Sequence, residues 1–91
     1  MQMIEATFVD LVGSMSKIKL KFEHKGVTYE GNVWSENDGR DAEIDHDSFN
    51  HPIPSDLEED FWEAIFETDE NCTIYENALK VGYAEWEKSR S

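Results

Sequence analysis

Two alternating segments, separated by a lysine and a glycine, constrain the fold of this chain more than any other feature. Residues 17–23 and 27–33 each alternate polar and apolar side chains at a period of two, which is typical of β-strands with one buried face. Lys25 and Gly26, which stand between them, suit a two-residue hairpin turn. The sequence therefore predicts an antiparallel hairpin over residues 17–33.

The side chains of the two halves agree with a single register. With a two-residue turn, the numbers of paired residues sum to 51. Phe22 then faces Tyr29 on the apolar side, and Lys21 faces Glu30 on the polar side, so that apolar side chains and opposite charges meet. We expect the lysines of the polar side to pair with acids and to blunt a sheet edge. These lysines are Lys17, Lys19 and Lys21.

Residues 3–12, which precede the hairpin, are ambiguous between strand and helix. Ile4, Ala6 and Phe8 follow strand alternation, but an apolar stripe at helical spacing is also present. The β-branched side chains of this segment and the stop at Gly13 favour a strand.

Three shorter segments follow the hairpin. Residues 35–39 have the composition of a turn. Residues 40–45 predict a short fourth strand with Ala42 and Ile44 facing inward. Residues 46–54 contain two prolines and are expected to form an extended connector.

The last third of the chain opens with a predicted helix. Ser55 and Glu58 match a capping box, in which two side chains satisfy free backbone N–H groups at a helix start. Leu57, Phe61 and Ile65 then form an apolar stripe at i, i+4 and i+8. We expect this stripe to pack on the sheet.

A second helix is predicted over residues 73–88, after an interruption at residues 68–71. Gly82 is expected to weaken this helix by roughly 1 kcal/mol relative to alanine. The side chains that we expect to face inward are Ile74, Tyr75, Ala78, Leu79, Val81, Gly82 and Trp86. The predicted fold is α+β: an N-terminal antiparallel sheet of three or four strands packed by two C-terminal helices, in a single domain of residues 1–91.

Charge is segregated along the chain. Residues 36–76 contain fifteen acidic residues against one basic residue, Arg40, which makes a formal charge of −14. The rest of the chain has seven basic and six acidic residues, so the net charge of −13 comes from one stretch. A domain with such a charge repels itself, and the repulsion is usually tolerated for solubility or for a cationic partner.

Composition disfavours several classes of protein. The single cysteine, Cys72, excludes an internal disulfide and suits a reducing compartment. Residues 1–5 have no positive region, and nowhere do eighteen apolar residues follow one another, so we expect neither a signal peptide nor a membrane span. A net charge of −13 disfavours direct binding to nucleic acid or to anionic lipid. We therefore expect a cytoplasmic protein.

The acids of the first predicted helix recur at i+3 and i+4, so they project from the side opposite its apolar stripe. Such neighbours lie about 5–6 Å apart, a spacing comparable to that of successive phosphates along a nucleic-acid strand. A row of carboxylates at this spacing can occupy a groove of Lys and Arg built for nucleic acid; the alternative is an ordinary solvated helix face. For Trp62, next to Phe61, two roles are open: packing in the core with Phe61, or partial exposure as an interface anchor. The candidate partner-binding residues are Asp45, Asp47, Asp56, Glu59, Asp60, Glu63, Glu67 and, in the second of these roles, Trp62.

No arrangement typical of catalysis or metal binding is present in the sequence. Serines, one cysteine and three histidines are available, but no spacing assembles them as nucleophile and base. Asp45, His46, Asp47 and His51 are close in sequence, but neighbours in an extended segment point in opposite directions. No cysteine pair or helical histidine pair supports them as ligands. We expect a protein without enzymatic activity, cofactor or metal.

In size, charge and absence of motifs the chain resembles small acidic anti-restriction and anti-CRISPR proteins of phages and mobile elements, and immunity proteins that neutralise nuclease toxins. The resemblance is one of composition and is carried by no particular residue. It implies a non-enzymatic inhibitor, a DNA mimic that acts in the host cytoplasm on a basic, nucleic-acid-handling protein such as a nuclease or a defence complex.

Two alternatives to an inhibitor follow from the same sequence. The first is a structural or adaptor subunit that forms a homodimer or a larger complex through its sheet edge and through Trp62 and Trp86. The second is adaptation to a saline habitat, which predicts acids spread over the whole surface. The concentration of acids in residues 36–76 counts against the second alternative.

Overall fold

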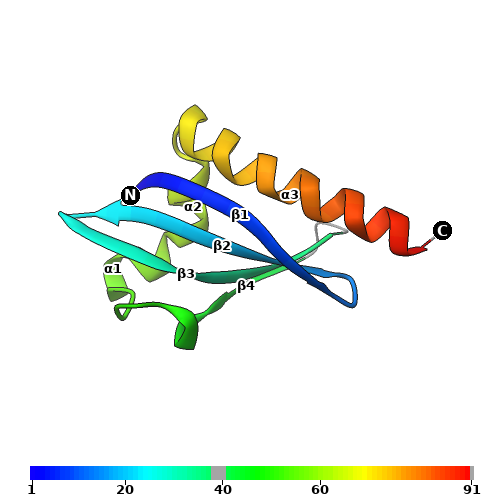
Figure 1. Cartoon of the computed structure of the whole chain (residues 1–91). Coiled ribbons are helices and arrows are strands. Elements are labelled where there is room, and N and C mark those ends of the chain that lie inside the picture. The colour runs from blue at the N-terminus through cyan, green and yellow to red at the C-terminus, as the bar shows by residue number, and fades with distance from the viewer. Residues whose placement is uncertain (38–40, 91) are drawn as a thin grey trace.

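A four-stranded antiparallel sheet and three α-helices make up the computed structural model, which describes residues 1–37 and 41–90 (Figure 1). The strands lie in the order β1-β2-β3-β4, each paired with the next. The sheet forms the N-terminal half and the helices the C-terminal half, which confirms the predicted α+β fold. The strands are β1 (Gln2–Val12), β2 (Met15–His24), β3 (Val27–Glu36) and β4 (Ala42–Asp45).

The hairpin of β2 and β3 has the predicted register. Phe22 pairs with Tyr29, and all other pairs obey the same sum. Lys25 and Gly26 have φ angles of 51° and 79°, as in a type I′ turn, whose twist matches that of the flanking strands. The buried apolar side chains of the hairpin are Ile18, Leu20, Phe22, Tyr29 and Val33.

The first segment is a strand, as predicted, and two irregularities explain its imperfect alternation. The pairing of β1 with β2 shifts register between Met3 and Glu5 and again between Phe8 and Asp10. Each shift is a β-bulge, which inserts one residue and moves the inward positions by one. The residues opposite the buried positions of β2 are therefore Met3, Ala6, Phe8 and Leu11.

The short fourth strand is present where it is predicted. Ala42 pairs with the buried Ser35, and Ile44 pairs with the buried Val33, so both β4 side chains face inward. Arg40, the first residue of the predicted strand, lies outside the described residues. The end of the predicted turn at residues 38–39 lies outside them as well.

The predicted extended connector after β4 is wrong in its first part. His46–Ser48 forms a 3₁₀ turn, η1, and the residues after it run along the edge of β3. The Ser48 hydroxyl accepts a hydrogen bond from the Asn32 N–H (2.7 Å), and the Asn50 side-chain oxygen accepts one from the Glu30 N–H (2.9 Å). These side chains take the place of a further strand and cover the edge of β3 beyond β4.

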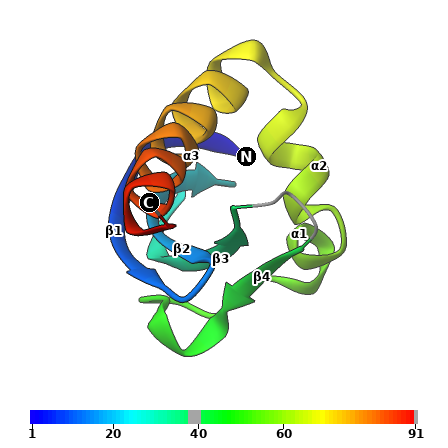
Figure 2. The same ribbon diagram turned by 90° about the vertical axis from the view of Figure 1, so that its right-hand side faces the viewer.

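All three helices pack on one face of the sheet (Figure 2): α3 lies next to β1, and α1 and α2 lie across from β3 and β4. The helices are α1 (Ser55–Glu59), α2 (Phe61–Phe66) and α3 (Asp69–Arg90). The core between sheet and helices consists of Met3, Ile18, Leu20, Phe22, Tyr29, Val33, Leu57, Phe61, Ile65, Tyr75 and Ala78. None of the helices in the described part of the chain combines the length and the hydropathy that a membrane span needs.

The first predicted helix is wrong in two respects. It is broken at Asp60, whose φ of −109° and ψ of 16° leave the helical range. The Asp60 carbonyl accepts a hydrogen bond from the Ala64 N–H (2.7 Å), which starts α2. The capping box is also wrong, because Pro54 occupies the N-cap position of α1 and no described side chain caps that helix. Ser55 therefore lies inside the first turn.

The second helix begins four residues earlier than predicted. The Asn71 N–H donates a hydrogen bond to the Thr68 hydroxyl (3.1 Å), the contact by which a threonine caps a helix. Asn71 is thus helical, and it is buried. Its side chain accepts a hydrogen bond from the Met3 N–H (2.8 Å) and donates to the carbonyls of Met1 (3.0 Å) and Ala64 (3.3 Å). These hydrogen bonds link β1, α2 and α3, and the spacing of apolar residues in the sequence does not predict them.

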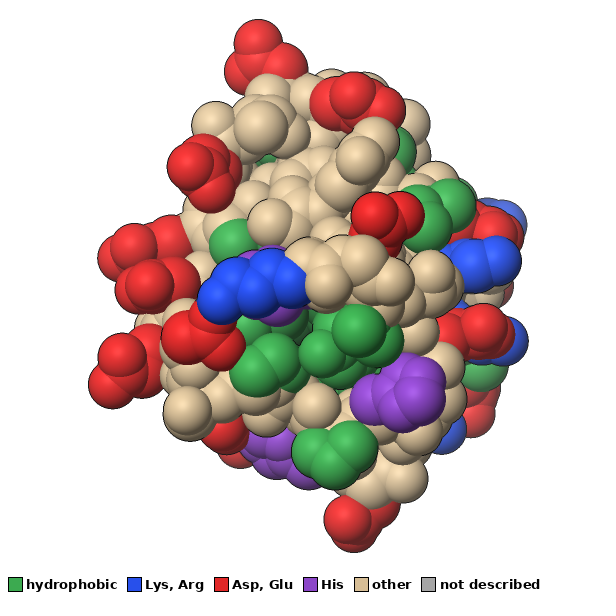
Figure 3. Space-filling view, turned by 90° about the vertical axis from the view of Figure 1, so that its left-hand side faces the viewer, with side chains coloured by type: hydrophobic (Ala, Val, Ile, Leu, Met, Phe, Trp, Pro, Cys, Tyr) green, Lys and Arg blue, Asp and Glu red, His purple; other side chains and the backbone are tan. Residues whose placement is uncertain are grey.

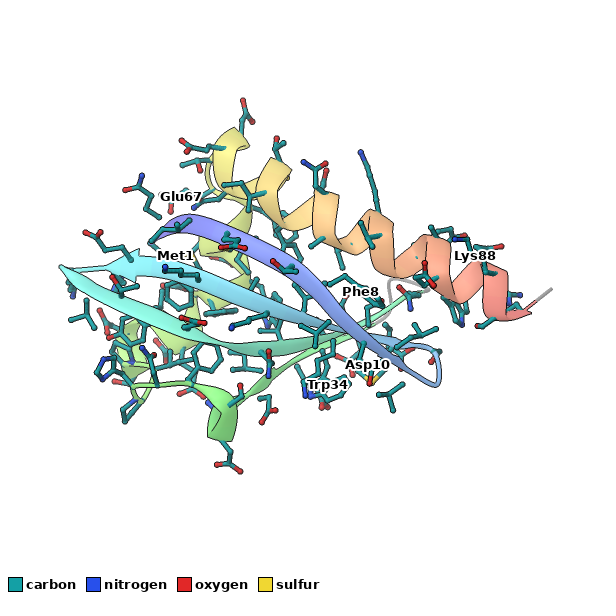
Figure 4. The ribbon with its side chains drawn as sticks, in the orientation of Figure 1. Met1, Phe8, Asp10, Trp34, Glu67 and Lys88 are labelled. Carbon is teal, nitrogen blue, oxygen red and sulfur yellow. The ribbon has the colours of Figure 1, made fainter. Side chains whose placement is uncertain are left out.

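Gly82 marks the closest approach of α3 to the sheet. A Cβ at this position would overlap the Ser16 side chain and would lie 3.2 Å from the Phe8 ring. Figure 4 shows Phe8 between β1 and α3. The glycine that weakens the helix locally is what allows helix and sheet to meet. Val81 beside it is 52% exposed, which corrects its predicted inward position.

Candidate protein-binding surface

The outer face of the sheet carries charges that neutralise one another. Lys19 and Glu30, which are diagonal neighbours, form an ion pair of 2.6 Å. Their hydrogen bond raises the pKa of Lys19 and lowers the pKa of Glu30. Lys17 lies over the Trp34 ring, 5.4 Å from its centroid, in a cation–π contact. The ion pair of Glu30 thus involves Lys19 rather than the directly opposite Lys21.

Asp56, a predicted partner-binding residue, is engaged inside the molecule. Its carboxylate lies 2.8 Å from Nζ of Lys25 and 3.7 Å from Nε2 of His24. The hydrogen bond from Lys25 lowers the pKa of Asp56. Because its charge is already matched, Asp56 fits a contact between α1 and the hairpin tip better than a contact with a partner.

Asp45 and Asp47 lie on β4 and η1 rather than on a helix. Asp45 is half-buried, and its carbonyl accepts a hydrogen bond from the Ser48 hydroxyl (2.6 Å). Asp47 is exposed. Between them His46 contacts Glu58 of α1 at 3.2 Å. These two acids therefore lie on different elements from Glu63 of α2 and the acids at the two ends of that helix.

Six exposed acids on the helical side have no cationic partner among the described residues. They lie at the end of α1, in α2, at the start of α3 and in the two junctions between these helices. No Lys or Arg occurs from residue 41 to residue 79. In Figure 3 acidic side chains project along the left and upper edges, whereas acidic and basic side chains alternate along the right edge. We refer to these six acids as the helical acidic surface: Glu59, Asp60, Glu63, Glu67, Asp69 and Glu70.

Within the helical acidic surface, three residues share one shallow hollow. Asp60, Glu63 and Glu67 line it together with Ala64. Figure 4 places Glu67 at the junction of α2 and α3, far from Asp10 and Trp34 at the other end of the sheet. The break in the helix thus separates the predicted row into Asp56, which is paired, and three acids that face solvent.

An apolar cavity of about 430 Å³ opens beside this surface. Trp62, Phe66 and Tyr75 form its aromatic wall, with the ring centroids of Trp62 and Phe66 at 6.2 and 5.8 Å from that of Tyr75. Trp62 is half-buried in this wall, Phe66 is 49% exposed, and the neighbouring Phe61 is in the core. The cavity is lined by Ser35, Asp41, Ala42, Trp62, Phe66, Tyr75 and Leu79.

Tyr75 is the most deeply buried residue of this wall, with 2% of its surface exposed. Burial raises the pKa of Tyr75 to about 12, an effect that a hydrogen bond with the Ser35 side chain reduces. The Tyr75 hydroxyl therefore stays protonated at neutral pH. Asp41 is the one acidic side chain among the described residues that line the cavity, and none of those residues is basic.

The described residues include no group of three or more His, Cys, Asp or Glu side chains placed to hold a metal ion. The Cys72 thiol donates a hydrogen bond to the Glu76 carboxylate (3.3 Å), and this contact raises the pKa of Cys72. A raised pKa disfavours the reactive thiolate. His51 packs edge-on against the Tyr29 ring, with centroids 6.0 Å apart. The contacts that this surface offers are electrostatic and apolar.

The sequence did not reveal the cavity, and comparison with known proteins adds nothing to it. The sequence matches no protein-family model and no curated protein, and the structure matches no solved structure. One signal was present: Trp62 and Phe66 are four residues apart and widen the apolar stripe of their helix. Their meeting with Leu79 of α3 and Ala42 of β4 depends on the packing of distant segments.

Proposed function

We propose that this protein is a non-enzymatic inhibitor that binds a basic, nucleic-acid-handling protein and occupies the site at which that protein binds nucleic acid. The observation that carries the proposal is the helical acidic surface, whose six exposed acids have no cation opposite them in the described part of the chain. Protein surfaces ordinarily mix charges of both signs, as the outer face of the sheet does here.

Three acids of this surface have a spacing that suits a mimic of a nucleic-acid strand. Glu63 lies in α2, and Asp60 and Glu67 are the residues at its two ends. Glu63 and Glu67 are four residues apart, and helical neighbours at this spacing lie about 5–6 Å apart. The helix that holds them is docked on the core through Phe61 and Ile65, which are fully buried. A row held in place in this way meets Lys and Arg side chains without a large entropy loss on binding.

The proposed mechanism is electrostatic competition. A net charge of −13 speeds the encounter with a cationic site. The carboxylates then contact Lys and Arg side chains that otherwise contact phosphates. Because salt screens such contacts, affinity is expected to fall as the ionic strength rises.

Affinity capture tests the proposal. The immobilised protein is exposed to a cell lysate at low salt, bound proteins are eluted with a salt gradient, and each is then purified and titrated directly. We expect a basic nucleic-acid-binding protein whose DNA binding is inhibited. Its affinity is expected to fall at least about 100-fold for Glu63→Lys/Glu67→Lys, because like charges then meet.

The matched control reverses two charges elsewhere. Glu5→Lys/Glu30→Lys changes the outer face of the sheet and is expected to alter affinity less than about threefold, because screening weakens charges that do not touch the partner. An affinity that stays constant between low and physiological salt would contradict electrostatic competition.

A homodimer through the sheet edge is the second candidate. In the described part of the chain β1 pairs on one side only, and its Ile4 and Val9 are 47% and 50% exposed. The two bulges and the like charge of two copies oppose strand pairing. Mass measurement in solution distinguishes the candidates: a dimer that is insensitive to salt supports this one, and a monomer excludes it.

A further inference from the structure

The cavity beside Trp62 adds an apolar element to the acidic surface. We infer that it receives one bulky apolar side chain of the basic partner, so that the partner's binding segment carries this side chain between Lys and Arg residues. The inference rests on the proposed function, because Glu63 of the helical acidic surface is a neighbour of Phe66 in the cavity wall. The inference adds that the partner is recognised through an apolar side chain as well as through its positive charge.

The cavity is large and apolar enough for such a side chain. Its volume of about 430 Å³ falls within the range of pockets that bind small ligands. Trp62 and Phe66 come from α2, Tyr75 and Leu79 from α3, and Ala42 from β4. With Ser35 of β3, four elements contribute to the lining of the cavity. Phe66 is 49% exposed, so a partner can cover it.

Among the described residues, the lining of the cavity and of the hollow next to it includes acids and no lysine. Asp41 lines it directly, and an adjoining hollow along α3 contains Glu36. Glu63 lies three residues before Phe66 and is thus its neighbour on the surface of α2. None of the described residues that line the three hollows on this side is Lys or Arg, whereas both hollows on the outer face of the sheet contain lysines.

An apolar cavity next to acidic residues determines what kind of segment can bind there. The acids repel a nucleic acid and a second copy of this chain, and an uncharged apolar segment gains no attraction from them. A segment with both features buries its apolar side chain in the cavity while its Lys and Arg pair with the surrounding acids. A buried anchor within a polar rim is the usual form of an interface hot spot.

Two capped pentapeptides test the inference: Lys-Arg-Phe-Arg-Lys, and Lys-Arg-Gly-Arg-Lys as its charge-matched control. Each is titrated at low salt into the intact, isotope-labelled protein, and binding is followed by NMR shifts of the backbone amides. We expect the phenylalanine peptide to bind at least about tenfold more tightly, because only it buries an aromatic ring. The amides that shift with this peptide alone are expected to lie around Trp62, Phe66 and Leu79.

Two side-chain truncations test whether the tighter binding of the phenylalanine peptide depends on the cavity. Phe66→Ala is expected to remove the difference between the two peptides. Val81→Ala is the matched control, because Val81 is 52% exposed but does not line the cavity, and it is expected to leave the difference unchanged. The dispersion of the same spectra shows that each variant is folded.

The outcomes separate the inference from the proposed function. If both peptides bind equally and Glu63→Lys/Glu67→Lys abolishes the binding of both, the inference about the cavity is overturned and the acidic surface stands. If neither peptide binds, both fail. A preference that survives Phe66→Ala, or shifted amides elsewhere on the molecule, also overturns the inference.

Discussion

Acidic residues of the outer face of the sheet lie next to lysines, whereas those of the helical acidic surface do not. On the sheet, antiparallel pairing brings Lys19 to 2.6 Å from Glu30. On the helical side Glu63 and Glu67 project into solvent with no cation opposite them among the described residues. The same residue type is thus neutralised on one side and left to repel its neighbours on the other.

The contrast arises from how each element finds its neighbours. A strand meets residues of the next strand, so a lysine of one segment meets an acid of another. A helix meets its own residues three or four positions away, and residues 41–79 contain no Lys or Arg. The helical acids can therefore be neutralised only by a distant segment or by a partner. Asp56 is neutralised by a distant segment, because Lys25 of the hairpin turn forms an ion pair with it.

Separating α3 from the sheet is expected to have the largest effect, because the helical side then loses its support. Gly82→Leu places a side chain where even a Cβ overlaps Ser16, and it is expected to lower the free energy of unfolding by about 3 kcal/mol or more. Denaturation in urea measures this loss. Gly82→Ala is expected to cost less, and less again in a Ser16→Gly background, where the overlapping atoms are absent. Equal costs in the two backgrounds would contradict the close approach.

Alkaline pH tests how tightly the aromatic wall of the helical side is buried. The pKa of Tyr75 is about 12, whereas an unfolded tyrosine has a pKa of about 10. The folded state therefore holds this proton more tightly, and the contribution is complete below pH 10 and lost as the pH rises to 12. The expected loss is about 2–3 kcal/mol, measured by urea denaturation across this range. Tyr75→Phe is expected to lose less, and an identical loss would refute the burial effect.

Neutralising the helical acids is expected to stabilise the protein. Glu63→Gln/Glu67→Gln removes a like-charge pair at i+4, so its Tm at low salt is expected to lie a few degrees above that of the wild type. Added salt is expected to raise the Tm of this variant less, because less repulsion remains to be screened. Thermal unfolding followed by circular dichroism at several salt concentrations measures both effects.

The corresponding double substitution on the outer face of the sheet is expected to lower the Tm. Glu5→Gln/Glu30→Gln leaves Lys19 without its partner, so its Tm is expected to fall below that of the wild type. If both double variants shift Tm in the same direction, the two faces do not differ as described.

Replacing single lysines on the outer face of the sheet is expected to have the smallest effects on stability. Lys19→Met is expected to lower Tm slightly, and Lys21→Met still less, because Lys19 is the one in contact with Glu30 and exposed ion pairs stabilise weakly. Lys19 lowers the pKa of Glu30, so this contribution is present above the ordinary glutamate pKa and is lost as the pH falls through the lowered pKa. The effect of Lys19→Met on Tm is expected to vanish in acid; a difference that persists there has another cause.

The hairpin could be predicted from sequence because two independent signals agree there. The period of two in residues 17–23 and 27–33 and the turn chemistry of Lys25 and Gly26 require the same register, and the structure has it. In β1 the apolar pattern is interrupted by two bulges. These inserted residues made the strand look irregular, although its β-branched side chains still indicated its type.

The helix boundaries could not be predicted from the same kind of pattern. Ser55 and Thr68 are both followed at a distance of three by a polar residue, but only Thr68 caps a helix. At Ser55 the preceding proline occupies the N-cap position. Which of two similar local patterns is used depends on where the chain enters the helix, and this is decided by packing against the sheet.

The register of the β2–β3 hairpin, the amount of charge and its concentration in one stretch follow from the sequence alone, because periodicity and composition are local properties. Which acids lack a cationic partner depends on tertiary contacts. Asp56 is matched by a hairpin lysine thirty-one positions earlier, whereas Glu63 and Glu67 meet no cation in the described part of the chain. The tertiary structure also creates the cavity, since Trp62 and Leu79 share a wall only after α2 and α3 dock on one sheet. Contacts between distant segments depend on that docking, and no local pattern encodes them.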